Sequence, residues 1–355
     1  MTKVDLLKTR AKLFALIREF FDARGFIEVD TPALVPLPSQ EPYLSPMQVN
    51  FSDIRNRQLN WFLTTSPEFA IKKLLAEGAR NVYQMSHVFR GGEAFGGTHN
   101  PEFMMLEWYR TPGNYEDIIN DTEELICHIR NELDPGSGPG MTESAGGAAT
   151  GTPTAHSPAK GGMSTGGVLA ATGPATFKRL TVAEAFLRFA DLPISDFQEK
   201  DWIDTAKKFG HTVATPDDAF FALFLNLVEK KLPKETPTFI TDYPLFQAAL
   251  AKKSGDGKTA ERCELYWQGL ELANGFSELT DADEQLARFK KEQTIRKSLG
   301  KPVYEIDPDF IAALKKGFPP TGGIALGVDR LLMALTGTKE INEILPLRPP
   351  LSPPW

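Results

Sequence analysis

The sequence predicts an α+β domain in which helices flank an antiparallel β-sheet. Three observations support this fold class. An amphipathic helix at the start of the chain leads into a short strand that ends at Thr31-Pro32. Two further strands, within residues 81–109, are joined by a glycine-rich loop. Another pair meets at the two-residue turn Gln268-Gly269, which is typical of a hairpin.

The composition is that of an ordinary globular protein. The 355 residues, 41% of them hydrophobic, suffice for one large core or two modest ones. A net charge of −7 argues against non-specific nucleic-acid binding, because that binding depends on Lys and Arg. Cys127 and Cys263 form no CxxC pair, so neither a disulfide framework nor a zinc site is expected. No apolar run of 18 residues occurs, and we expect a cytoplasmic protein without a membrane partner.

The first helix is expected over residues 4 to 24, where apolar residues recur at helical spacing and Gly25 provides a stop. The following strand, 26–30, should end before Pro32, because proline cannot donate a hydrogen bond to a sheet. Together they predict a unit of helix, strand and proline.

A second helix start is predicted at Ser66-Pro67-Glu68. Ser66 suits the N-cap, Pro67 the first helical position and Glu68 the first turn, where acids are favoured. We expect this helix to end at about Glu77. Strands are then predicted at 81–89 and 102–109, and a helix at 115–133.

Residues 135–176 differ sharply from the rest of the chain. Gly, Ala, Ser, Thr and Pro dominate, with only Glu143 and Lys160 charged and no aromatic residue before Phe177. Such a segment buries too little apolar surface to offset its ordering entropy, so we predict a disordered insertion. It would interrupt a single catalytic domain made of residues 1–134 and 177–355.

The predicted strand EFMMLEWY has two different faces, because side chains alternate along a strand. Met104, Leu106 and Trp108 would face a core. Glu107 and Tyr109 share the other face with Phe103 and Met105. This face would suit a cationic ligand if it formed the floor of a pocket, and a solvent-wetted edge is the alternative.

Two acids flank the predicted hairpin turn. With the turn at Gln268-Gly269, Tyr266 faces Glu271 and Glu264 lies diagonally opposite on the same face, about 7 to 8 Å away at the backbone. That spacing allows both carboxylates to reach one Mg²⁺ held with nucleotide phosphates. Two unrelated surface acids are the alternative.

A third constellation, residues 322–333, combines glycines, a short apolar strand and a helix start that carries Arg330. A helix N-terminus with a nearby guanidinium is a natural phosphate site. Close packing of the helix on the sheet would require the same glycines, and this alternative stays open.

These pieces, in this order, resemble the signature motifs of class II aminoacyl-tRNA synthetases, most closely those of the lysine enzymes. Motif 1 resembles residues 26–32, motif 2 resembles FRGGEAFGGTHNPEFMMLEWYR at 89–110, and motif 3 resembles GIALGVDRLLM at 323–333. The strings HNPEF and ANGFSELTDADEQLARF are also similar. The resemblance implies the class II core, an antiparallel β-sheet flanked by helices.

The resemblance implies an ATP site. Arg90 would hold the α-phosphate of ATP and the substrate carboxylate, Phe103 would lie under the adenine, and Arg330 would cover its other face. Glu264 and Glu271 match the acids that bind Mg²⁺ with ATP. The remaining ATP-site candidates lie in a motif 2 loop that is one residue longer than usual: Glu93, His99 and Asn100.

The resemblance also implies a site for a cationic amino acid. Glu68 would take the α-amino group, Asn274 the carboxylate, and Tyr109 with Glu278 the distal ammonium. The aspartate enzymes carry arginine where Glu278 stands, so the acid favours lysine. Strand parity places Glu278 opposite Glu271 unless the strand is distorted, and we expect the distortion at Asn274-Gly275.

The missing parts suggest the acceptor. Motif 1 begins near residue 26, so we expect no anticodon-binding domain of the kind that the tRNA enzymes carry. This form resembles the truncated ligases of the family, which transfer (R)-β-lysine to a lysine side chain of elongation factor P. Ser66 and Ala325 agree, since the tRNA enzymes typically carry Ala and Gly there. The resemblance therefore implies lysine or (R)-β-lysine as substrate, elongation factor P rather than tRNA as acceptor, and a homodimer.

Two other functions stay open. The chain could be a stand-alone lysyl ligase that acts on tRNA or a small amine. It could also be a synthetase paralogue without catalysis that serves as a regulatory subunit. The joint presence of Arg90, Glu264, Glu271 and Arg330 favours an enzyme.

Overall fold

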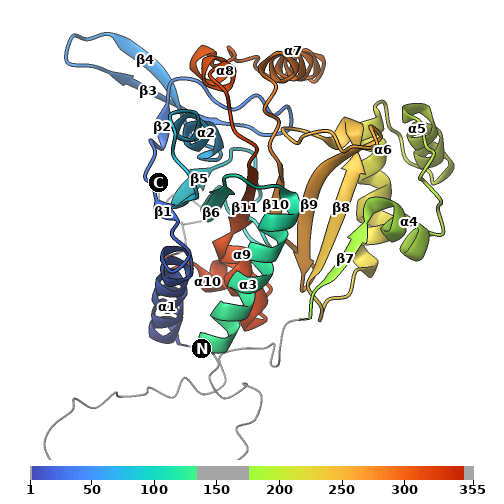
Figure 1. Ribbon diagram of the computed structural model, residues 1–355, viewed down its shortest axis with the longest axis horizontal. Coiled ribbons are helices and arrows are strands. Elements are labelled where there is room, and N and C mark those ends of the chain that lie inside the picture. The colour runs from blue at the N-terminus through green and yellow to red at the C-terminus, as the bar shows by residue number, and fades with distance from the viewer. Residues whose placement is uncertain (1, 134–175, 348–355) are drawn as a thin grey trace, which may run out of the picture.

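The computed structural model describes residues 2–133 and 176–347 (Figure 1). Residues 135–175 of the predicted insertion and the last eight residues lie outside this range. The described chain folds around an eight-stranded sheet, with helices on both of its faces and a small three-stranded sheet at one end. Among the described helices, none is long and apolar enough to cross a membrane.

The helical elements, including three short turns labelled η, are α1 (Lys3–Asp22), α2 (Glu68–Ala76), α3 (Tyr115–Leu133), α4 (Val182–Ala190), α5 (Glu199–Lys208), α6 (Pro216–Leu223), η1 (Phe224–Val228), η2 (Glu229–Lys231), η3 (Leu245–Gln247), α7 (Ala282–Ser298), α8 (Pro308–Lys315), α9 (Val328–Thr336) and α10 (Ile341–Ile344). The strands are β1 (Ile27–Glu28), β2 (Leu34–Val35), β3 (Met47–Ser52), β4 (Gln58–Leu63), β5 (Val82–Phe89), β6 (Glu102–Arg110), β7 (Lys178–Thr181), β8 (Thr238–Pro244), β9 (Thr259–Trp267), β10 (Leu270–Ser277) and β11 (Gly322–Gly327).

The main sheet has the strand order β1-β5-β6-β11-β10-β9-β8-β7. All pairs from β5 to β8 are antiparallel, which confirms the predicted fold class. The two edge pairs, β1 with β5 and β7 with β8, are parallel, so the sheet is mixed at its margins. Strands from before the insertion (β1, β5, β6) and after it (β7 to β11) share this one sheet, and they meet at the antiparallel pair of β6 with β11.

Helix α1 is defined at both ends by local chemistry. The hydroxyl of Thr2 accepts a hydrogen bond from the backbone of Asp5, whose carboxylate accepts one from the backbone of Thr2. This reciprocal capping satisfies two N–H groups that the helix leaves unpaired. Gly25 follows the helix with φ of +73°, a conformation that glycine adopts without strain. The prediction for 4 to 24 is therefore confirmed within two residues.

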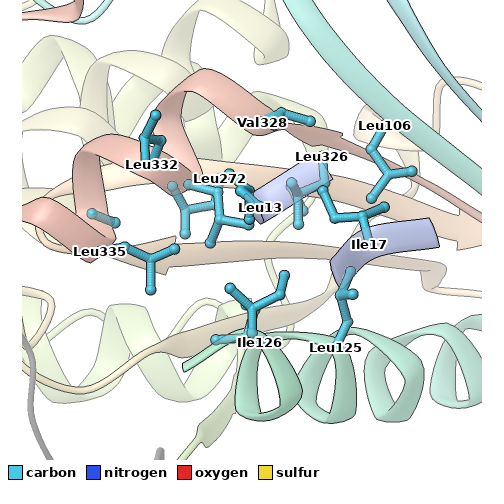
Figure 2. Packing of buried hydrophobic residues seen from close by; sticks show 14 of the residues in the cluster. Leu13, Ile17, Leu106, Leu125, Ile126, Leu272, Leu326, Val328, Leu332 and Leu335 are labelled. Atoms are coloured by element: carbon cyan, nitrogen blue, oxygen red, sulfur yellow. The ribbon is translucent and has the colours of Figure 1, made fainter. Parts of the chain in front are cut away.

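The main hydrophobic core lies on one face of the sheet. Leu13 and Ile17 of α1, with side chains of α3 and α9, point toward one another and toward Leu106 and Leu326 of the sheet (Figure 2). All four of these side chains are fully buried. Burial of one such side chain contributes about 1.5 to 3 kcal/mol, so this layer fixes the central strands. The opposite face of those strands is left for the site.

The predicted hairpin is present. Gln268 and Gly269 have φ of +55° and +74°, the positive values that a type I′ turn requires, and Tyr266 pairs with Glu271. The expected distortion of the second strand exists, but its predicted position is wrong. The register shifts between Glu271 and Ala273, before Asn274-Gly275 is reached.

Gly275 serves a different purpose. A Cβ at this position would lie 2.6 Å from the Cβ of Ile324 on β11, so glycine permits the close approach of the two strands.

Candidate active site

One cavity of about 620 Å³ opens on the face of the sheet opposite the main core. Strands β6, β10 and β11 form part of its wall, and residues of α7 and of the segment 41–44 contribute to its lining. All but one of the predicted site residues line it: Ser66, Glu68, Arg90, Glu93, His99, Asn100, Phe103, Glu107, Tyr109, Glu271, Asn274, Glu278, Ala325 and Arg330. The exception is Glu264.

Strand β6 forms one wall of the cavity, and its two faces are as predicted. Its odd-numbered residues from Phe103 to Tyr109 line the cavity. Its even-numbered residues Met104, Leu106 and Trp108 belong to the main core. The alternative of a solvent-wetted edge is excluded, because Glu107 and Tyr109 are 1% and 3% exposed.

A hydrogen-bond network holds Glu107 at the floor of the cavity. Ser66 donates to its Oε1 at 2.6 Å and Tyr109 donates to its Oε2 at 2.9 Å. Burial and the neighbouring Glu68 raise the pKa of Glu107 to about 8. The carboxyl group is therefore poised to lose its proton when a cation arrives nearby.

Helix α2 begins at Glu68, so the prediction that Ser66 is its N-cap is off by one residue. Pro67 occupies the cap position and has no side chain to cap with. The hydroxyl of Ser66 still accepts a hydrogen bond from the backbone of Glu68 at 3.0 Å. Ser66 thus links the helix start to Glu107 on β6.

Glu278, the second buried acid of the cavity, forms an ion pair with a lysine that the sequence did not lead us to expect. Lys72, one turn after Glu68 on α2, forms ion pairs with Glu68 and, at 2.5 Å, with Oε2 of Glu278. Lys72 and Glu278 are 1% and 2% exposed. Burial raises the pKa of Glu278 to about 8 although Lys72 opposes this shift. The i, i+4 spacing of Glu68 and Lys72 is the signal that could have found the pair.

The absence of a side chain at Gly323 leaves space for the side chains of Glu278 and Tyr109. A Cβ there would lie 2.1 Å from Oε1 of Glu278 and 2.5 Å from the ring of Tyr109. Both side chains therefore lie directly against the β11 backbone. Oε1 of Glu278 has no hydrogen-bond partner among the described residues.

The cavity lining also carries two arginines. The guanidinium of Arg90 lies 5.2 Å from the centre of the Phe103 ring. Arg330 donates to the backbone oxygens of Thr98 at 3.2 Å and of Glu271 at 3.0 Å, so it connects the loop after β5 with the hairpin. Two cations, one of them beside an aromatic ring, suit phosphates and a flat base.

The loop residues at this end are close to one another. His99 and Glu93 approach to 3.8 Å. Burial and the charge of Arg330 lower the pKa of His99, which favours its neutral form. Asn100 is buried and donates to the backbone of Glu102, while its side-chain oxygen has no partner among the described residues.

Glu264 lies behind the cavity wall. Tyr243 and Tyr266 donate to its Oε2 at 2.6 and 2.5 Å, and Arg262 pairs with its Oε1 at 2.5 Å. Arg262 also donates to the side-chain oxygen of Asn274 at 3.2 Å.

Glu271 does line the cavity. Burial and the charge of Glu264 raise its pKa to about 7. A cation beside Glu271 would stabilise its ionised form.

Comparison with known proteins identifies the family. The family model of class II tRNA synthetases (D, K and N) matches residues 2–348. This chain belongs to the class II tRNA synthetases. Curated relatives in this family are named elongation factor P–(R)-β-lysine ligase. Those of Avibacterium paragallinarum and Proteus mirabilis are each 36% identical over 348 residues. That of Pasteurella multocida is 36% identical over 347 residues. Each alignment covers 96% of this chain and 94% of the relative.

Class II membership implies an enzyme that uses ATP and explains the order of the structural elements. Motif 2 corresponds to β5, the loop and β6, and motif 3 corresponds to β11 and α9. Asp329 at the start of α9 pairs with Arg10 of α1 at 2.5 Å and accepts from the backbone of Met104 at 2.8 Å. These contacts fix the first turn of α9, and hence Arg330, relative to β6.

Proposed function

We propose that this chain is an ATP-dependent, AMP-forming ligase that activates lysine or (R)-β-lysine and transfers it to a lysine side chain of elongation factor P. The names of its relatives supply the acceptor and the isomer. The single observation that carries the proposal is one cavity lined by the buried carboxylates Glu107 and Glu278 and by two arginines, of which Arg90 lies beside the Phe103 ring. We call the part around the carboxylates the carboxylate end and the part around Arg90 and Arg330 the arginine end.

The carboxylate end is proposed to bind the ammonium groups of the substrate. Glu107 and Glu278 are buried, and burial raises the pKa of both to about 8. Buried carboxylates are costly unless a cation compensates them, so a cationic ligand stabilises this end. Glu68 is proposed to receive the amino group near the substrate carboxylate, and Tyr109 with Glu278 to face the distal ammonium.

The arginine end is proposed to bind ATP, with adenine between Phe103 and Arg330. Arg90 would then hold the α-phosphate and, together with Asn274, orient the substrate carboxylate. A carboxylate oxygen attacks the α-phosphorus, the bond to the β-phosphate oxygen breaks, and pyrophosphate leaves. The enzyme's part is positioning and charge stabilisation, and one such contact is worth about 10² to 10³ in rate.

In the second step the neutral amine of an acceptor lysine attacks the carbonyl carbon of the adenylate. An amide bond forms, AMP leaves, and the amine proton passes to solvent. Glu271, which lines the cavity, is proposed to hold Mg²⁺ together with Glu264, and the ion would neutralise charge on the ATP phosphates. Glu264 does not line the cavity and would have to exchange a contact with Tyr243, Tyr266 or Arg262 for the ion. The raised pKa of Glu271 supports a cation at this place.

The chain is further proposed to form a homodimer through α1 and β1. Helix α1 buries most of its apolar residues in the core, yet Val4 and Leu7 are 59% and 43% exposed, and Ile27 on β1 is 57% exposed. A second copy would cover these side chains. Sedimentation analysis at micromolar concentration should give the mass of two chains, and a monomer would contradict this proposal.

Residues 1–134 and 177–355 are proposed to act as one catalytic domain, because strands of both segments share one sheet. The proposed place of action is the cytoplasm, where the acceptor, a translation factor, works.

Lysine-dependent exchange of pyrophosphate into ATP tests the first step. The proposal predicts exchange with lysine or (R)-β-lysine and none with aspartate or asparagine. Absence of exchange with every amino acid would favour the non-catalytic paralogue. A parallel reaction with tRNA separates the stand-alone lysyl ligase, which would form an alkali-labile aminoacyl ester where the proposed enzyme forms none.

A further inference from the structure

Lys72 is the one fully buried lysine in the part of the chain that the structure describes. It lies on α2 and is 1% exposed. Its ammonium pairs with Glu68 and Glu278, and it lies 5.4 Å from the centre of the Phe276 ring. The two glutamates and Phe276 line the cavity, whereas Lys72 does not. Lys72 therefore stands behind the carboxylates and does not occupy the space of the substrate.

We propose that Lys72 is a built-in counter-ion that sets the charge of the substrate pocket, so that the pocket accepts an amino acid carrying two ammonium groups. This inference rests on the proposed function and adds a specificity-determining, positioning residue to it.

The charge count supports this role. The charged groups that interact with Lys72 from the packed elements are Glu68 on its own helix, Glu278 after β10 and Glu107 on β6. Glu41 contributes a more distant negative charge. When ionised, the three nearest glutamates carry −3 and Lys72 carries +1. The remaining −2 balances the +2 of two substrate ammonium groups.

Lys72 also controls the direction of its partners. Its ion pair with Oε2 of Glu278 leaves Oε1 beside Gly323 and Tyr109, at the cavity wall and without an ion pair among the described residues. One oxygen of the carboxylate is thus held from behind and the other is presented to a ligand. Although burial disfavours the charged form of Lys72, Glu278 and Glu68 raise its pKa, so the cation persists.

Removal of the positive charge of Lys72 should weaken the binding of lysine. Without Lys72, the ionised form of Glu278 loses its nearest positive charge, and its pKa rises above the parent's value of about 8. At neutral pH the carboxyl group of the variant is then harder to ionise than that of the parent, so it binds the distal ammonium of the substrate less readily. The pocket should bind lysine less well and should discriminate less against an analogue with a neutral side chain.

The test replaces Lys72 with methionine, which keeps the unbranched chain and removes the charge. Pyrophosphate exchange is measured from pH 6 to 9.5 with lysine and with norleucine, an analogue that has one ammonium group. Lys72→Met should raise the KM for lysine at least tenfold at pH 7, with KM for ATP within twofold. The midpoint of the pH dependence of the lysine KM should move up by about one unit or more. The preference for lysine over norleucine should fall at least tenfold.

Lys73→Met is the matched control. Lys73 is the next residue of α2, but its ammonium pairs with Asp307 at 2.5 Å and does not line the cavity. This variant should keep the parent's lysine KM and pH midpoint. Lys72→Arg retains the charge and should keep the midpoint even if its KM changes.

The outcomes distinguish a failure of the inference about Lys72 from a failure of the proposed function. A folded Lys72→Met variant with the parent's midpoint and lysine preference would overturn the inference, while the proposed function would stand. If that variant fails to fold, a shifted midpoint in Lys72→Arg would overturn it instead. If the parent enzyme itself shows no lysine-dependent exchange, the proposed function fails.

Discussion

Replacement of Glu278 by glutamine tests the cationic pocket, because it keeps the shape of the side chain and removes its charge. A carboxylate about 4 Å from an ammonium group contributes about 4 kcal/mol at an effective dielectric constant of about 20. The pKa of about 8 means that ionisation at pH 7 costs about 1.4 kcal/mol of this. The remaining 2 to 3 kcal/mol corresponds to a loss of about 30- to 150-fold in kcat/KM for lysine.

The assay is lysine-dependent pyrophosphate exchange, with the KM for ATP measured in parallel. Glu278→Gln should leave the ATP value within about twofold, because Glu278 pairs with Lys72 and not with either of the two arginines proposed to bind ATP. Glu77→Gln is a suitable control, since this exposed glutamate after α2 pairs with Lys316 and does not line the cavity. A Glu278→Gln enzyme that activates lysine as well as the parent would refute the assignment of a cationic substrate.

Three further predictions concern the same cavity. Gly323→Ala should reduce lysine activation at least 100-fold, because the added Cβ would lie 2.1 Å from Oε1 of Glu278. Gly255→Ala, whose Cβ would meet open space, should have no effect in the same exchange assay. Phe103→Ala should raise the KM for ATP about tenfold before it affects the KM for lysine, as titrations of each substrate would show. Because burial raises the pKa of Glu107 to about 8, kcat/KM for lysine should increase as the pH rises through 8, and a flat profile from pH 6 to 9 would contradict this. The contribution of Glu107 to the free energy of unfolding should instead decrease as the pH rises. It is full below about pH 4.5 and is lost as the pH rises through 8, and chemical denaturation across that range would measure it.

Features that depend on neighbouring residues were predictable from the sequence. The turn at Gln268-Gly269 follows from two residues that tolerate positive φ, and the pairing of Tyr266 with Glu271 follows from the turn. The two faces of β6 follow from the alternation of side chains, which the polar Glu107 marks on one side. In each case the decisive interaction lies within a few residues along the chain.

Features that depend on distant segments were not predictable. The bulge near Leu272 depends on how β10 pairs with β9, and turn chemistry alone does not locate it. Glu264 accepts a hydrogen bond from Tyr243 of β8 as well as from residues of its own strand, and the sequence around Glu264 does not predict the partner on β8. Lys72 carried a local signal through Glu68, but its partner Glu278 is more than 200 residues away.

The most direct test of the account is the intact mass of purified elongation factor P after incubation with this enzyme and ATP. Separate reactions contain (R)-β-lysine, α-lysine or no amino acid, and Arg330→Ala serves as the inactive control. The account predicts that elongation factor P gains the mass of one lysyl residue with at least one isomer, only with the parent enzyme. An unchanged mass with both isomers, while the same enzyme preparation charges tRNA with lysine, would contradict it.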